Sequence, residues 1–386
     1  MNHCGRQSYR GRYPPVINKD RSKSQSYQPT DILFARSGKP VQLLRKIGQG
    51  GEGSIHETDW PNLVAKVYHK GMNDRRQLEK IQQLIDLRIG DPSFCLPTEI
   101  LHDHGQVFRG FLMPRMPATA ISLQGSIFQP TKLLATYPNW TRRESTELAI
   151  TILKKIQLLH SRGILIGDIS PTNILMSDSR TIHFIDCDSY QIDRFPCPVA
   201  TPLFTPPELQ GMSLRQTFRT VEHELFAIAV LLFMIFMPGK GPYSHKGGDQ
   251  AIANIRKGHF PYSLGERHSD GAPIGPWRLC WSHLSRNIKT AFHRSFHRDH
   301  ISKPRVSIDR WLTILRKYAW FLSRDENVFH GPAHNTGVDL SIMPANFRRV
   351  RTEDGRIEPP WRTDSLTDRQ ARTRNLKLFS NFGGNK

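Results

Sequence analysis

The sequence predicts an α+β fold of two unequal lobes, a small β-rich N-terminal lobe with one helix and a larger, mainly helical C-terminal lobe. Up to residue 116, short apolar runs typical of strands surround one segment whose apolar residues recur at helical spacing. Beyond residue 116, most apolar runs have the 3.6-residue period of helices. The 386 residues are enough for such a domain with additional segments at both ends.

The predicted N-terminal lobe covers residues 41–116. Its strands are expected where short apolar runs are bounded by glycine, asparagine or proline, at 41–47, 54–57, 62–68 and 107–113. A glycine-rich turn at 48–53 joins the first two strands. The single helix is expected over 73–87, where leucine and isoleucine recur every three or four residues.

The predicted C-terminal lobe covers residues 117–322. Helices are expected at 142–160, 222–237, 287–296 and 307–322. The helix at 222–237 is apolar on nearly all sides, which predicts that it is buried. Two short strands, at 174–176 and 182–185, flank a turn in this otherwise helical lobe.

Both ends of the chain are polar and rich in arginine. Residues 1–40 predict a basic flexible arm, and residues 323–386 predict a basic, largely flexible tail. The formal net charge is +20 and the pI is about 10.0. This charge favours acidic partners, and nucleic acid bound through the basic tails is one interpretation. The alternative is a cytosolic protein whose basic tails bind no polyanion.

Cysteine usage and hydropathy indicate a cytoplasmic protein. The five cysteines contain no Cys-x-x-Cys pair, so a structural zinc ribbon is not expected, and their wide spacing fits reduced thiols. The N-terminus is polar and basic, unlike a signal peptide. The longest apolar run, residues 225–237, is too short to cross a bilayer, so no membrane association is expected.

The pattern most informative about chemistry is Asp168, then Asn173 five positions later, then Asp186 after an apolar strand. Transfer of a phosphoryl group from a magnesium nucleotide needs this set. One carboxylate orients the acceptor hydroxyl, while an amide and a second carboxylate hold Mg²⁺. The sequence therefore predicts Asp168 as the catalytic base and Asn173 with Asp186 as metal ligands.

A glycine-rich turn precedes this set. Residues 48–53 (GQGGEG) lie between two predicted strands, which argues against a dinucleotide-binding fold, where a helix follows the glycines. Glycines without Cβ let backbone N–H groups approach phosphate oxygens. The expected contacts with ATP are Gly48, Gly50, Gly51 and Gly53. An ordinary glycine hairpin is the alternative.

Lys66 lies within a short apolar strand, where a buried ammonium needs an anionic partner. Nucleotide phosphates would serve, bridged by a helix carboxylate, for which Glu79 is the first candidate and Asp74 the second. The alternative is a lysine that extends to water from the end of the strand. Ile55 on the preceding predicted strand and Val64 on the strand of Lys66 complete the expected nucleotide contacts.

Residues 111–116 (FLMPRM) are expected to connect the two lobes. Adenine needs one backbone acceptor and one donor. Met113 is expected to line the adenine site, Pro114 can offer only its carbonyl, and Met116 can offer its N–H group.

In this order, the motifs resemble a protein kinase domain over residues 41 to about 320. The resemblance includes 200–208 (ATPLFTPPE), which precedes the substrate-docking helices of kinases. Gly167-Asp168, 185–189 (IDCDS) and 205–209 (TPPEL) further resemble a divergent bacterial group that joins a kinase-like domain to a helix-hairpin-helix domain. No helix-hairpin-helix is evident here.

The resemblance implies a serine/threonine protein kinase that uses ATP and Mg²⁺ on a protein substrate in bacterial signalling. It assigns the α- and β-phosphates to Lys66, which would pair with Glu79. It also implies a buried ion pair between Glu208 and Arg305. Glu224 takes the place where kinases usually have an aspartate that supports the catalytic loop.

Several positions depart from the kinase pattern. Ile166-Gly167 replaces the usual His-Arg, which removes the cation that docks a phosphorylated activation loop and predicts activity independent of that phosphorylation. Ser170 replaces a lysine near the transferring phosphate. Asp188 replaces the glycine of Asp-Phe-Gly and is either a second carboxylate near the metal or a turn acid.

Three other functions remain open at this point. Small-molecule kinases share the Asp168 and Asn173 pattern but generally lack the segment at 205–208, which favours protein acceptors. Thr201 favours serine or threonine hydroxyls over tyrosine. A nucleotide-binding pseudokinase acting as a regulatory scaffold and a basic nucleic-acid-associated sensor are the remaining alternatives.

Overall fold

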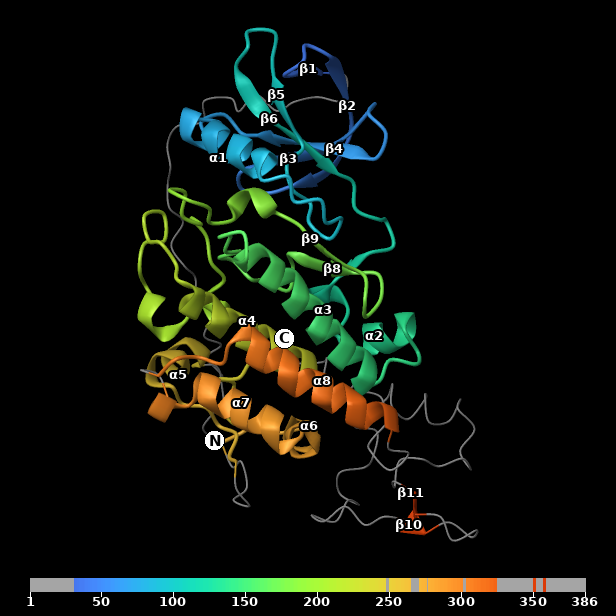
Figure 1. Ribbon diagram of the computed structural model, residues 1–386, viewed down its shortest axis with the longest axis vertical. Helices are drawn as coiled ribbons and strands as arrows, with labels where there is room; N and C mark the ends of the chain where they lie inside the picture. The colour runs from blue at the N-terminus through green and yellow to red at the C-terminus, as the bar shows by residue number, and fades with distance from the viewer. Residues whose placement is uncertain are drawn as a thin grey trace, which may run out of the picture.

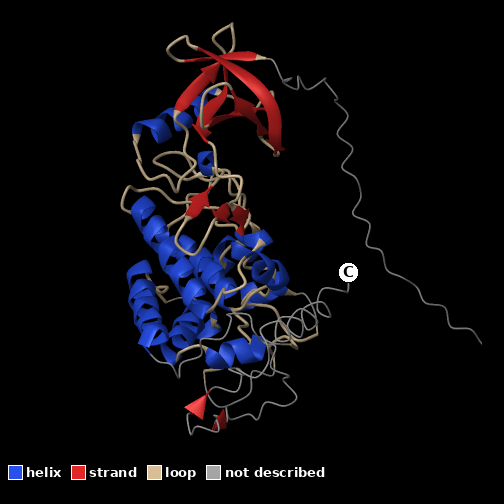
Figure 2. Cartoon of the chain, turned by 90° about the vertical axis from the view of Figure 1, so that its right-hand side faces the viewer, coloured by secondary structure: helices blue, strands red, loops and turns tan. Residues whose placement is uncertain are grey.

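The computed structural model describes residues 31–247, 250–264, 271–275, 277–300 and 303–324, together with 350–351 and 357–358. A β-rich part comes first and a helical part follows, which confirms the predicted α+β class (Figure 1). Figure 2 shows the long strands at one end of the molecule, a few short strands below them and most helices further toward the other end. The first 30 residues of the predicted arm, and most of the predicted tail, lie outside the described residues.

Six antiparallel strands form a closed barrel in the order β1-β2-β3-β4-β6-β5. They are β1 (Ile32–Ala35), β2 (Pro40–Gln49), β3 (Gly53–Thr58), β4 (Leu63–Tyr68), β5 (Glu99–His102) and β6 (Phe108–Pro114). The pairing of β1 with β5 closes the barrel. Its interior is filled by side chains from five of the strands: Leu33, Ala35, Val41, Leu43, Ala65, Val67, Leu101 and Leu112.

Two of these strands were not predicted. Residues 31–40 were assigned to the flexible arm, but β1 and the start of β2 lie there, so the arm ends earlier than expected. Strands β1 and β5 have four residues each, too few to show a reliable two-residue period. They are stabilised by pairing and by side chains such as Leu33 and Leu101 that enter the barrel, neither of which a local pattern reveals.

Helix α1 (Arg75–Asp86) packs beside the barrel and begins at Asp74. The Asp74 side chain accepts a hydrogen bond from the backbone N–H of Gln77 at 2.8 Å, so this carboxylate caps the helix rather than pairing with Lys66. The face of α1 that turns inward buries Lys80, Ile81 and Leu84.

The helical part is built on α3 (Arg142–His160) and α4 (Val221–Phe236). Helix α4 is the buried apolar helix that the sequence predicted, and α8 (Ile308–Arg324) lies along α3 (Figure 1). The other helices are α2 (Pro130–Thr136), α5 (Ala251–Lys257), α6 (Trp277–His283) and α7 (Arg286–Phe296). Within the described residues, no helix is both long and apolar enough to cross a membrane.

A small sheet of β7 (Ile121–Ser122), β8 (Ile174–Met176) and β9 (Ile182–Phe184) lies at the junction of the two parts. The segment before β5 is joined to β9 because Cys95 donates its N–H to the Phe184 carbonyl at 2.9 Å. The rings of Phe94 and Phe184 also stack at 5.2 Å. These contacts fix the barrel against the loops that carry the candidate site. Strands β10 (Val350–Arg351) and β11 (Ile357–Glu358) pair with each other within the predicted tail.

Candidate active site

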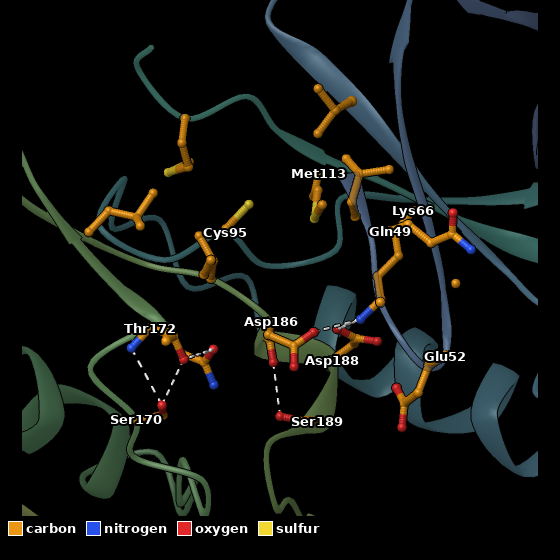
Figure 3. Close-up of a pocket in the computed structure, with 18 of the residues that line it drawn as sticks. Gln49, Glu52, Lys66, Cys95, Met113, Ser170, Thr172, Asp186, Asp188 and Ser189 are labelled. Carbon is orange, nitrogen blue, oxygen red and sulfur yellow. Dashed lines mark hydrogen bonds and ion pairs between the residues drawn. The ribbon is translucent and has the colours of Figure 1, made fainter. Parts of the chain in front are cut away.

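A cleft of about 820 Å³ separates the barrel from the loops around β8 and β9 (Figure 3). It collects most of the residues that the sequence predicted for nucleotide, metal and catalysis. Those that line it are Gly50, Gly51, Gly53, Ile55, Val64, Lys66, Met113, Pro114, Met116, Asp168, Asn173 and Asp186. Two predicted residues do not line it. Gly48 pairs with Ile55 within the barrel, and Glu79 lies on α1.

The hairpin between β2 and β3 forms the glycine-rich edge of the cleft. Gly50 donates its N–H to the Gly53 carbonyl at 2.8 Å, which closes the turn. A Cβ at Gly53 would collide with the Val67 carbonyl oxygen of β4. Only glycine at 53 therefore allows the hairpin to pack this closely on β4.

The loop that carries Asp168 is held from below by α4. The Glu224 carboxylate accepts hydrogen bonds from the backbone N–H groups of Ile166 at 3.2 Å and Gly167 at 2.8 Å. His160 Nε2 lies 2.9 Å from the same carboxylate. Glu224 thus makes the backbone contacts expected of the aspartate it replaces, although its side chain is longer by one methylene.

Asp168 is bound by Thr201, which lies 33 residues later. The backbone N–H and the hydroxyl of Thr201 both donate to Asp168 Oδ1, at 2.7 and 2.8 Å. Since both bonds use one carboxylate oxygen, Oδ2 remains able to accept a proton. This is the arrangement that a positioned general base requires.

Lys66 is almost fully buried, and its ammonium contacts two carboxylates (Figure 3). Its Nζ lies 2.7 Å from Asp186 Oδ1 and 2.6 Å from Asp188 Oδ1. Burial alone would lower the pKa of Lys66, but the two carboxylates outweigh it and raise the pKa. The lysine is therefore a fixed cation at the inner wall of the cleft.

The predicted ion pair between Lys66 and Glu79 is wrong for this structure. Glu79 pairs instead with Arg75 at 3.1 Å and with Arg194 at 2.7 Å. The helix is turned so that Lys80 and Ile81 are buried while the Glu79 side chain is 36% exposed. The spacing of apolar residues located α1 correctly but did not fix which of its carboxylates faces the site.

Asp188 takes the place expected of Glu79, and sequence reasoning missed this role. Its side chain is 1% exposed, and Tyr68 donates its hydroxyl to Asp188 Oδ2 at 2.7 Å. Burial would raise the pKa of Asp188, but Lys66 and the Tyr68 hydrogen bond lower it, so the carboxylate stays ionised. Asp188 is not a free turn acid, because Lys66 and Tyr68 contact its two carboxylate oxygens. Its one sequence signal was an acid where kinases have glycine.

Asn173 and Asp186 both line the cleft, and the Asp186 side chain is 45% exposed. Mg²⁺ prefers oxygen ligands and usually takes one or two carboxylates together with substrate phosphates. The amide oxygen of Asn173 and the carboxylate of Asp186 fit that preference. Among the described residues, no group of three or more His, Cys, Asp or Glu side chains forms a metal site without a nucleotide.

The segment expected to bind adenine also lines the cleft, with one difference from the prediction. The Pro114 carbonyl, expected to accept a bond from adenine, already accepts one from the Cys95 thiol at 3.1 Å. Burial raises the pKa of Cys95 to about 12, so this thiol is neutral and acts as a donor. A second lone pair on the Pro114 oxygen remains for adenine.

Glu208 and Arg305 form the ion pair that the resemblance implies. Arg305 Nη1 lies 2.7 Å from Glu208 Oε1, and Nη2 donates to Oε2 at 3.0 Å. The pair is less buried than expected, since the Glu208 side chain is 38% exposed and that of Arg305 is 9% exposed. Arg305 also donates to the Glu222 carbonyl at 3.0 Å, so it ties residues 205–208 to the start of α4.

The structure shows the contacts of two further residues that depart from the kinase pattern, Ser170 and Cys187. The Ser170 hydroxyl lies 2.7 Å from the Thr172 hydroxyl, so a neutral pair stands where kinases have a lysine. Cys187 is buried, and its thiol donates to the Phe184 carbonyl at 3.3 Å. Burial raises its pKa well above the usual value, which makes Cys187 a core thiol rather than a reactive one.

Comparison with known proteins agrees with this geometry. The chain is 26% identical over 298 residues to protein kinase YegI of Escherichia coli K12. The aligned region covers 73% of this chain and 45% of the relative. It is 28% identical over 123 residues to the probable serine/threonine-protein kinase PknB of Lactococcus lactis, covering 31% of this chain and 19% of the relative.

A human relative is also a kinase chain. The liver/testis isoform of the phosphorylase b kinase gamma catalytic chain is 25% identical over 132 residues, which are 33% of this chain and 32% of the relative. This chain is related to the protein kinase superfamily. No family model matches it. The chain spans less than half the length of the YegI proteins it matches.

Proposed function

We propose that this chain is a divergent serine/threonine protein kinase with a two-lobed kinase fold, using ATP and Mg²⁺ in the bacterial cytoplasm. The observation that carries the proposal is the bonding of Thr201 to Asp168 Oδ1 in a cleft that also holds Lys66, Asn173 and Asp186. In the kinases that this chain resembles, a threonine at this position accompanies serine or threonine acceptors.

The chain's own groups would act by position and charge. Asp168 would orient the acceptor hydroxyl and take its proton at Oδ2, because Thr201 fixes the carboxylate through Oδ1. Lys66 would hold the α- and β-phosphates while Asp188 keeps its ammonium in place. The glycine hairpin at 50–53 would cover the phosphates and exclude water. Mg²⁺, held by Asn173 and Asp186, would supply charge neutralisation of the phosphates.

Two observations favour a pseudokinase as the second candidate. The Asp186 carboxylate expected to hold Mg²⁺ is 2.7 Å from Lys66, and Ser170 supplies no cation beside the transferring group. A regulatory scaffold would bind nucleotide without turnover. Nucleic-acid binding is a weaker proposal, since it is supported only by the charge of +20.

The test is transfer of label from γ-labelled ATP, with Mg²⁺, to a generic basic protein acceptor. Asp168→Asn removes the base and should lower the transfer rate by about 10²–10⁴-fold. Asp193→Asn is the matched control, since Asp193 is exposed and asparagine tolerates its positive φ of 39°. No transfer by the wild-type protein, with nucleotide still bound, would favour the pseudokinase.

A further inference from the structure

Arg219 holds the segment that carries Thr201. Its guanidinium donates from Nη1 to the Cys197 carbonyl at 2.9 Å and from Nη2 to the Val199 carbonyl at 2.5 Å. Arg219 is 6% exposed. Two residues after Val199, Thr201 binds Asp168. The same short segment is therefore fixed at one end by a buried cation and at the other by the catalytic carboxylate.

The backbone of Arg219 is itself fixed by Gln191. The Arg219 N–H donates to Gln191 Oε1 at 2.7 Å, and Gln191 Nε2 donates to the Arg219 carbonyl at 2.8 Å. Gln191 pairs in turn with Leu165, at the start of the loop that leads to Asp168. This places the guanidinium at one position relative to that loop.

The guanidinium occupies the space made available by Gly167. A Cβ built on Gly167 would lie 2.8 Å from Arg219 Nη1 and 2.5 Å from Cys197 Cβ. Gly167 also has a φ of +75°, which favours glycine. A long side chain at residue 167 and the observed position of Arg219 are therefore mutually exclusive. The cation absent from position 167 is replaced in space by Arg219, which lies 52 residues later in the chain.

The Arg219 guanidinium is bonded to backbone carbonyls and not to a carboxylate of the described residues. In the part of the chain that the structure describes, no carboxylate lies within ion-pair distance of Arg219, and its guanidinium is bonded to backbone carbonyls. A cation satisfied in this way is tied to one backbone conformation, because movement of the segment would leave a buried charge without acceptors. It also needs no phosphate to complete the contact.

We propose that Arg219 is a positioning residue that holds residues 197–201 in the substrate-competent conformation without phosphorylation of this segment. The proposal rests on the proposed kinase function. Where a phosphorylated residue would recruit a cation after modification, Arg219 already clamps the segment through its carbonyls. The chain then needs no phosphorylation of this segment to be active.

The test compares the full chain with Arg219→Met and Arg219→Lys. Methionine keeps most of the volume and removes all donors, while lysine keeps the charge and one point of donation. Arg215→Met is the matched control, because Arg215 is an exposed arginine of the same loop. The first readout is hydrogen exchange of the amides at 197–201, which does not need catalysis. The second is phosphoryl transfer, with ATP and acceptor varied separately.

The clamp predicts faster amide exchange at 197–201 in Arg219→Met, with α1 and α3 unchanged. It also predicts a loss of about 10–100-fold in kcat/KM for the acceptor. The KM for ATP should stay within about twofold of the wild-type value. Arg219→Lys should have an amide exchange rate and a kcat/KM between those of the wild-type protein and Arg219→Met. Phosphatase treatment should leave the wild-type protein fully active.

Unchanged exchange and transfer in Arg219→Met would overturn the proposal, and so would a wild-type protein inactivated by phosphatase. An equal decrease in kcat/KM for ATP and for the acceptor, together with faster amide exchange throughout the chain, would show a purely structural role for Arg219. That result would also overturn the proposal. If the wild-type protein transfers no phosphate, the kinase function is wrong, and amide exchange alone decides whether Arg219 clamps the segment.

Discussion

The Lys66 ammonium lies 2.6 Å from Asp188 Oδ1, within an interior where both side chains are almost fully buried. This contact does what a helix glutamate does in the expected kinase pattern. Helix α1 is still connected to the site, but through Tyr68 instead of through a direct ion pair with Lys66. Gln77 of α1 donates to the Tyr68 hydroxyl at 2.7 Å, and Tyr68 donates to Asp188. The position of α1 is thus coupled to Lys66 through two hydrogen bonds and one ion pair.

The first prediction separates Asp188 from Glu79. Asp188→Asn should lower kcat/KM for phosphoryl transfer by about 10–100-fold, because a displaced Lys66 no longer positions the phosphates. Glu79→Gln should change it by less than about twofold, since Glu79 makes only partly exposed ion pairs with Arg75 and Arg194. Both variants are measured with the same acceptor. The reverse ranking would show that α1 rotates during turnover and brings Glu79 to Lys66.

The second prediction concerns stability. Lys66→Met should lower the free energy of unfolding by roughly 3 kcal/mol, because it leaves the buried Asp188 carboxylate without its cation. Lys66→Met combined with Asp188→Asn should recover part of that loss, since the uncompensated charge is gone. Urea unfolding of the three proteins measures this. Equal stability of Lys66→Met and the wild-type protein would mean that Asp188 takes up a proton or water when its cation is removed.

The sequence was most informative where local chemistry decides the structure. Helix α3 begins and ends where predicted, at Arg142 and His160, because Thr141 and Glu144 form a capping box that marks its start. Helix α4 was found because its apolar residues leave no polar face. The cleft residues were found because the order of the motifs along the chain restricts what they can be.

The sequence was least informative where a contact joins distant residues. The spacing that located α1 is satisfied by several rotations of the helix, and only tertiary packing selects the one that buries Lys80 and exposes Glu79. Arg219 has no motif around it, because its role depends on space left by Gly167 on another loop. The kinase pattern predicts a helix carboxylate as the partner of Lys66, whereas the structure gives that place to Asp188.

The third prediction concerns the ion pair between Glu208 and Arg305. A charged hydrogen-bonded pair contributes about 1.5–3 kcal/mol, and each kcal/mol shifts a domain of this size by about 2–4 °C, which together give about 3–12 °C. Arg305→Met should lower the melting temperature by about 4 °C, near the lower end, because the Glu208 side chain is 38% exposed and solvent weakens the pair. Arg310→Met is the matched control, because Arg310 is an exposed arginine near the start of α8. Differential scanning calorimetry gives both values. An equal shift in the two variants would exclude a special contribution from the pair.

The last prediction is a pH dependence that originates at His283. Burial, together with the nearby cations of Arg142 and Lys289, lowers the pKa of His283 to about 3. Arg142 Nη2 lies 3.2 Å from His283 Nδ1. The ordinary value for histidine is 6.5. Between pH 6.5 and about 3 the unfolded chain therefore binds a proton at this ring that the folded chain does not.

A group with a lowered folded pKa contributes stability that is present above the unfolded value and lost as the pH falls. The free energy of unfolding should thus decrease as the pH is lowered from 7 to 5, by about 2 kcal/mol from this residue. His283→Gln cannot take up that proton, so its stability should fall less over the same interval. Urea unfolding at several pH values between 7 and 5 compares the two slopes. Identical slopes would mean that His283 becomes protonated in the folded protein, which would require Arg142 to move away.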